Sequence, residues 1–207
     1  MDDIKDIIKE IKKSFRLSMN GVASRSMREK GLDYKINWGL TLPQLKQLAA
    51  QYDKNAQLAI ELWKDDVREC KILATLLMPA EEMSIELAEL WMEQTHSQEM
   101  AEMLAFNLYQ HLDFAPALAY KWMASEDIAS QICAYQILAR LFMQGKEPNE
   151  RGINEFIDQA MTALQNDNIG LKHAVMNCIQ HFSNLGLLYE RLIQSALKKL
   201  DAPQKES

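Results

Sequence analysis

Turn-forming residues are scarce through the middle of this sequence. Glycine is absent between residues 40 and 144, and Pro79 and Pro116 stand where helices are expected to begin. Glycine and proline are the residues that most often punctuate secondary structure. Their absence, together with apolar residues at helical spacing, predicts a run of closely connected helices and an all-α fold.

Cysteines are also few. Cys70, Cys133 and Cys178 are an odd number, each lies in an apolar helical stretch, and no C-x-x-C pair occurs. A disulfide framework would need an even set at regular spacing, and it would belong to an oxidising compartment. We therefore expect three buried free thiols.

Long apolar runs and targeting signals are missing as well. No run approaches the roughly eighteen residues of a membrane span. The first fifteen residues carry four acidic side chains, which a secretory signal would not contain. These features predict a cytoplasmic protein that does not enter a membrane.

Motifs for cofactors and metals are likewise absent. The sequence has no G-x-x-x-x-G-K-S/T, G-x-G-x-x-G or G-x-S-x-G pattern, so phosphate-loop and hydrolase chemistry lack support. His96, His111, His173 and His181 show no metal-ligand spacing with cysteine or aspartate. We expect neither a cofactor nor a bound metal.

Three tryptophans recur at a period of about thirty residues. Trp63, Trp91 and Trp122 each close an apolar helical segment, and nine to twelve residues after each of them come two apolar residues and an alanine. Such self-similarity is typical of HEAT or armadillo repeats, in which helix pairs stack into a superhelix. We predict one HEAT-like repeat domain over residues 1–207, with a frayed tail at 201–207 and the three tryptophans in its core.

The apolar pattern also predicts where the helices lie. Ile4, Ile7, Ile8, Ile11 and Phe15 mark one face of a first helix, and Thr41 should cap a helix that has Pro43 in its first turn. Residues 32–40 show no periodicity and are expected to form a loop. The remaining helices are expected at about 22–30, 42–52, 55–64, 67–78, 81–94, 97–110, 115–124, 127–143, 149–165, 168–183 and 186–200.

Charge is distributed unevenly. Residues 1–35 contain nine Lys or Arg against six Asp or Glu, whereas residues 81–130 contain ten acids against Lys121 alone. Despite the net charge of −6, the inner surface of the repeats could attract phosphate if the acids lie on the outer helices, because the local field decides. A solvated acidic face without a partner is the alternative.

Three segments resemble the AlkD-like DNA alkylation repair family. They are Gly39-Leu-Thr-Leu-Pro-Gln-Leu-Lys46, Leu62-Trp63 through Val67-Arg-Glu-Cys-Lys-Ile-Leu-Ala74, and Lys121-Trp122-Met-Ala-Ser-Glu-Asp127. The likeness runs over residues 1–183. It implies a HEAT-like solenoid that binds duplex DNA and, in the members that are glycosylases, excises positively charged alkylated purines.

The resemblance also implies where such chemistry would lie. The family's W-x-x-x-D motif falls on Gln98 and Glu102, its arginine on Ile132 and its second tryptophan on Asn177. Glu102 is therefore the candidate catalytic residue, and the loss of the aromatic and arginine positions predicts weak base excision. Fold resemblance alone does not establish activity.

We expect binding to the backbone and shape of duplex or branched DNA, and the candidate contacts are polar residues on the amino-terminal segment and on the second helix of each repeat. For any one of them, pairing with a neighbour is the alternative, such as Arg68 with Asp65 or Glu69. Two other functions stay open: an active glycosylase that uses Glu102, and a scaffold that binds a protein partner. The candidate DNA-binding residues are Arg25, Arg28, Lys30, Lys35, Arg68, Lys71, Gln98, Gln131, Arg140, Lys172, His173 and Asn177.

Overall fold

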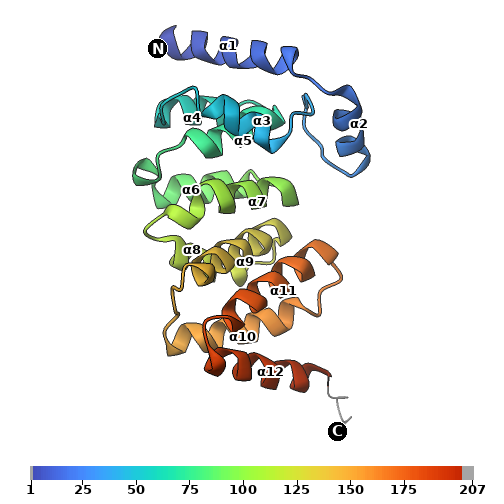
Figure 1. Cartoon of the computed structure of the whole chain (residues 1–207), viewed down its shortest axis with the longest axis vertical. Helices are drawn as coiled ribbons and strands as arrows, with labels where there is room; N and C mark the ends of the chain where they lie inside the picture. Colours follow the sequence, from blue (N-terminus) through green and yellow to red (C-terminus); the bar gives the residue numbers. More distant parts are fainter. Residues whose placement is uncertain (1, 202–207) are drawn as a thin grey trace. The chain divides into compact units, whose positions relative to one another are not determined.

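The structure is a computed structural model that describes the backbone of residues 2–201 and the side chains of residues 3–200. Over this range it is helical, as the sequence predicts, and the expected loop at 32–40 is present (Figure 1). Apart from Asp201, which ends the last helix, the tail expected at 201–207 lies outside the described residues. The helices are α1 Asp2–Leu17, α2 Gly21–Glu29, α3 Leu42–Ala49, α4 Ala56–Trp63, α5 Arg68–Leu77, α6 Ile85–Glu93, α7 Gln98–Asn107, α8 Ala115–Met123, α9 Ile128–Met143, α10 Glu150–Ala163, α11 Ile169–Ser183 and α12 Leu187–Asp201, with 3-10 turns η1 Ala80–Glu82 and η2 Tyr109–His111.

Two expected helices are divided. Residues 97–110 form α7 and then the start of η2 at Tyr109. Residues 81–94 form η1 and then α6, because Ser84 accepts a hydrogen bond from the backbone N–H of Leu87 and so begins a new helix. Elsewhere the expected caps hold. Thr41 and Gln44 form a reciprocal capping box at the start of α3, and Pro116 lies in the first turn of α8.

The chain divides into two compact units, unit 1 up to Ala88 and unit 2 from Glu89. In unit 1, α5 packs against α3 and α4, and α1 lies against α4. In unit 2, α9 packs against α7, α8 and α11, while α10 packs against α8, α11 and α12. Successive antiparallel helix pairs in each unit are the HEAT-like arrangement that the repeats predict (Figure 1). None of the helices within residues 2–201 has both the length and the apolarity needed to cross a bilayer.

The three repeat tryptophans belong to the core. Trp63, Trp91 and Trp122 are 3%, 1% and 6% exposed, which confirms that they pack between helices and do not stack on a ligand. The three cysteines are free and buried, as predicted. Burial raises the pKa of the Cys70 thiol to about 12, so this thiol is neutral and unreactive at physiological pH.

Candidate nucleic-acid interface

A basic helix projects from unit 1 beside the end of α1. Every residue of α2 keeps part of its surface exposed, whereas α1 and α3 each contain buried residues. Arg25 and Arg28 on this helix, and Lys30 and Lys35 just after it, are all exposed. Four of the predicted DNA contacts are thus gathered on α2 and its following loop.

This helix is tied to the loop that leads to α3. The Asn20 N–H donates to the Trp38 carbonyl at 2.8 Å, the Ser24 hydroxyl donates to the Asn37 carbonyl at 2.7 Å, and Arg28 Nη1 donates to the Tyr34 carbonyl at 3.1 Å. These bonds join α2 to residues 34–38 along its length. We refer to residues 20–40 as the α2 module.

Gly39 allows the module to close. Its φ of +75° lies in the left-handed region, and a Cβ at this position would stand 2.3 Å from the Asn20 carbonyl oxygen. Glycine therefore serves both the backbone conformation and the close approach of the loop to α2. The Gly39-x-x-x-Pro43 segment singled out in the sequence owes its first residue to this contact.

A buried carboxylate anchors the α2 module to α5. Glu69 is fully buried, and it accepts hydrogen bonds from the backbone N–H groups of Trp38 at 3.1 Å and Leu40 at 3.3 Å. A bridge between Ile36 and Val67 adds a second attachment. These contacts supply hydrogen-bond partners for backbone groups of the loop that have none within the loop itself.

Arg68 completes this anchor, which corrects the expectation that it lines an open face. Its side chain is buried, with Nη1 2.9 Å from the Leu40 carbonyl and 3.2 Å from Glu69 Oε1. The alternative pairing of Arg68 with Glu69 is therefore the one observed. The cause is that the loop from residue 36 to 40 covers this part of α5 and withdraws its charges from water.

Lys71 is also engaged inside unit 1. Its half-buried ammonium donates to the Trp63 carbonyl at 3.2 Å and lies 4.3 Å from the centre of the Trp63 ring. A cation at the C-terminal end of α4 is stabilised by the helix dipole and by the aromatic face. Burial lowers the pKa of Lys71, and nearby Asp66 partly opposes this. We assign Lys71 to holding α4 against α5.

In unit 2, the predicted catalytic position lies where α7 approaches the start of α11. Gln98 Nε2 donates to Glu102 Oε1 at 2.9 Å, and Glu102 is half-buried. A Cβ at Gly170 would stand 2.1 Å from Gln98 Oε1, so the amide of Gln98 rests directly on the first turn of α11. The structure brings Gln98, Glu102 and Gly170 together.

The other two positions implied by the resemblance do not complete a lesion pocket. Ile132 is buried in α9, whereas Asn177 is exposed on α11 and offers a short amide where a broad aromatic wall is expected. An aromatic face attracts a cationic base by about 0.5 to 2 kcal/mol and also excludes water. Glu102 therefore stands without the groups that would hold such a base against it.

The remaining candidate DNA contacts in unit 2 differ in whether their side chains are already engaged within the protein. Gln131 donates to the Ser125 carbonyl, and the guanidinium of Arg140 lies 4.4 Å from the centre of the Phe106 ring, so both are partly engaged. His173 and Asn177 are exposed, and Lys172 is half-buried, all on α11. Because these three residues belong to one helix, only those on the same face of α11 can contact one ligand together.

Acidic residues are not confined to the first helix of each pair. Glu86 and Glu93 are exposed on α6, but Glu99 and Glu102 lie on α7, which carries no Lys or Arg. The second helices of unit 2 thus combine Arg140 and Lys172 with two carboxylates. The α2 module is the more clearly basic of the two candidate surfaces.

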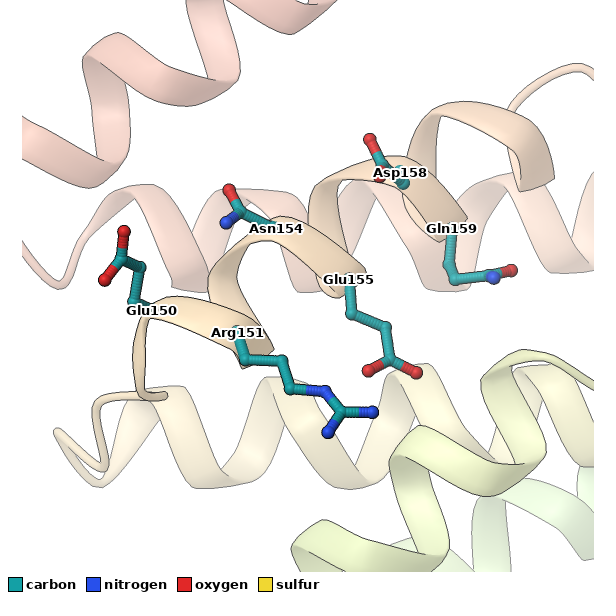
Figure 2. A pocket seen from close by; sticks show the side chains of 6 residues that line it. All are labelled: Glu150, Arg151, Asn154, Glu155, Asp158 and Gln159. Atoms are coloured by element: carbon teal, nitrogen blue, oxygen red, sulfur yellow. The ribbon is translucent and has the colours of Figure 1, made fainter.

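Two surface depressions in unit 2 differ in the elements that line them. One of about 550 Å³ is lined by six polar residues that all project from α10, so it is an open helix face (Figure 2). Another of about 360 Å³ lies among α6, α8 and α9, where Lys121 is paired with Glu89. Within the described residues, no three His, Cys, Asp or Glu side chains are placed to hold a metal ion.

Sequence reasoning missed the groups that support the α2 module. Glu69 looks like one acid in a charged segment, and its role depends on a loop about thirty residues earlier in the chain. Leu17, Met19 and Val22, all exposed, also escaped notice. Their signal was present, because Leu17 falls out of phase with the apolar face that ends at Phe15.

Comparison with known proteins agrees with this fold. A family model described as DNA alkylation repair enzyme matches residues 4–179. A solved structure from "a new family of proteins related to the HEAT-like repeat DNA glycosylases with affinity for branched DNA structures" aligns with a TM-score of 0.79 over 95% of this chain and 83% of that chain, at 14% identity. That likeness establishes the HEAT-like fold. No curated protein matches the sequence.

Proposed function

Because the chain belongs to the DNA alkylation repair enzyme family, we propose that it is a DNA-binding HEAT-like repeat protein with little alkylpurine glycosylase activity. Binding is directed to the phosphate backbone, with contributions from the α2 module and from the polar side chains of α11. We also propose that residues 1–207 act as one domain, in the cytoplasm and without a cofactor.

The observation that carries this proposal is the exposed basic face of the α2 module. Arg25, Arg28, Lys30 and Lys35 lie on a helix and loop that are fixed to the unit by backbone hydrogen bonds. Cations on a fixed backbone neutralise phosphates and release counterions without the cost of ordering the backbone that carries them. This set contains no groove-reading motif, so we expect weak dependence on sequence.

Branched DNA is the substrate class that we favour. The structurally similar family is described as having affinity for branched DNA structures. A protein that recognises backbone geometry can prefer one form of DNA only if its shape differs from that of ordinary duplex. A branch point has such a shape. The alternative in which the chain is a protein-binding scaffold requires no exposed basic helix.

Charge reversal on α2 should weaken DNA binding. In the double variant Arg25→Glu, Lys30→Glu, we expect the affinity for any duplex at low salt to fall at least about tenfold. The slope of log affinity against log salt should shrink by about 1 for each lost phosphate contact. Fluorescence anisotropy with labelled DNA measures both quantities.

A matched control is available in the same unit. Lys46 and Lys54 are also exposed but lie outside the α2 module. The double variant Lys46→Glu, Lys54→Glu has the same net charge as the first, so it separates a local contact from a general charge effect. Equal losses in both double variants would count against the α2 module as the binding surface.

Base excision should be weak and should depend on Glu102. The hydrogen bond from Gln98 orients this carboxylate, but Ile132 and Asn177 cannot hold a cationic base beside it. Preorganised surroundings supply most of the electrostatic stabilisation of a cationic transition state. We expect little release of methylated purines from alkylated duplex DNA. The Glu102→Gln variant should lose the small activity that remains.

The same assay distinguishes the rival glycosylase function. Rapid base release by the wild-type protein that disappears in Glu102→Gln would establish an active glycosylase with Glu102 as its electrostatic group. Release that survives the substitution would assign the activity to another site or to a contaminating enzyme. Quantification of freed bases by chromatography gives the readout.

A further inference from the structure

Three large apolar side chains stand in water at the turn between α1 and α2. Leu17 is 81% exposed, Met19 63% and Val22 83%, and they fall within six consecutive residues. We call this group the apolar tip. Single exposed apolar residues are ordinary, but three within six consecutive residues of one turn make a candidate place of contact.

The core of unit 1 does not require these side chains. Ile11 and Phe15, on the apolar face of α1, are fully buried, and Leu17 follows them on a different side of the helix. Val22 lies in the first turn of α2, a helix whose residues all remain partly exposed. Their exposure therefore has no explanation in folding.

The apolar tip is firmly supported. The Arg16 guanidinium, next to Leu17, lies 5.9 Å from the centre of the Trp38 ring. The Ala23 N–H, next to Val22, donates to Asn20 Oδ1 at 3.0 Å, and Asn20 is in turn bonded to Trp38. A fixed apolar projection loses little conformational entropy when it meets a partner.

The charges around the apolar tip identify the chemistry of that partner. Between residues 16 and 30 the charged side chains are Arg16, Arg25, Arg28 and Lys30, with Glu29 as the one acid. A polyanion matches this set. Phosphates alone would leave the apolar tip in water, so the best match is a polyanion that also presents an exposed apolar face.

DNA with a branch point has both properties. In a continuous duplex the faces of the bases are covered by stacking, whereas at a junction the terminal pair of an arm can expose its face. Several architectural proteins insert apolar side chains between base pairs of a duplex and partly unstack them, while basic residues contact the DNA nearby. We expect the same two kinds of contact here: apolar side chains on a base pair and basic side chains on the phosphates.

We propose that the apolar tip packs against the unstacked base pair at a DNA branch point, while the basic residues of the α2 module hold the adjoining phosphates. This inference rests on the proposed DNA binding and adds the element that distinguishes branched from linear DNA. Leu17, Met19 and Val22 are the specificity-determining residues.

The test compares a four-way junction with a linear duplex of the same arm sequence. In the triple variant Leu17→Ser, Met19→Ser, Val22→Ser, affinity for the junction should fall about tenfold, with a change of less than about twofold for the duplex. A junction carrying 2-aminopurine beside the branch point should brighten on binding the wild-type protein, and this signal should be lost with the variant. Leu187→Ser, Leu188→Ser is the control, since both leucines are exposed in unit 2.

Each outcome is decisive. If wild-type protein binds neither DNA, the proposed function fails and this inference fails with it. If the protein binds DNA and the triple variant keeps the junction preference and the 2-aminopurine signal, this inference alone is wrong. Loss of self-association in the triple variant, or of sedimentation with vesicles containing anionic lipid, with DNA binding unchanged, would assign the apolar tip to a second copy or a membrane surface and would overturn the proposal.

Discussion

Replacement of Arg68 by alanine is expected to lower the free energy of unfolding by about 3 to 5 kcal/mol, because it leaves the Glu69 carboxylate buried without its charged partner. Glu69 is fully buried and Arg68 is 3% exposed, so water does not compensate the remaining charge. The same change removes the hydrogen bond from Arg68 to the Leu40 carbonyl. Denaturant unfolding monitored by circular dichroism measures the loss.

Arg25→Ala is the matched control for Arg68→Ala. Arg25 is exposed on α2, so its removal should change stability by no more than about 0.5 kcal/mol while weakening DNA binding. The two arginines are thus expected to separate stability from binding. If Arg68→Ala unfolded at the wild-type denaturant concentration and lost only DNA affinity, the anchoring role of Arg68 would be wrong.

Trp91→Ala should also destabilise the protein by about 3 to 5 kcal/mol. Trp91 is among the largest fully buried side chains, and its removal leaves a cavity that the closely packed helices cannot fill. A thermal melt or a denaturant titration reports the effect.

Leu90 offers a comparison one residue away. It lies on the same helix but is 46% exposed, so Leu90→Ala should cost less than about 1 kcal/mol. A difference of that size between Trp91→Ala and Leu90→Ala would show that the loss of stability depends on burial of the side chain and not on its position along α6. Unchanged stability in Trp91→Ala would contradict the repeat-core role of the tryptophans.

The sequence predicted the helices well because their signals are local. The capping pair of Thr41 and Gln44, the prolines at helix starts and the recurring tryptophans each act within a few residues of where they occur. The pairing of helices followed from the period of the tryptophan segments. These features need no knowledge of distant contacts.

The site was harder to predict because its residues depend on contacts between distant segments. Arg68 and Lys71 share the pattern of surface cations, yet the loop over α5 and the end of α4 bury them. The cations of α2 are exposed, as a DNA contact requires, but the hydrogen bonds that fix this helix were not predicted. Local charge patterns do not reveal which face of a helix another segment will cover.

The basic residues that we propose for DNA binding on α2 and the carboxylate that we propose for base release lie in different units. The basic α2 module belongs to unit 1, whereas Glu102 and Gln98 lie in unit 2 on a helix without cations. Glu102 can therefore be replaced without disturbing α2, and the charges of α2 can be reversed without touching Glu102. Glu102→Gln is expected to remove any residual base release while leaving DNA binding unchanged, whereas reversal of the α2 charges should weaken binding and lower base release with it.

The most direct measurement is the affinity of the wild-type protein for a four-way junction and for a matched linear duplex across a series of salt concentrations. The proposed function predicts binding to both at low salt, a linear fall of log affinity with log salt, and tighter binding to the junction. Absence of binding at low salt, or an affinity that does not change with salt, would contradict a DNA-binding role directed to the phosphate backbone.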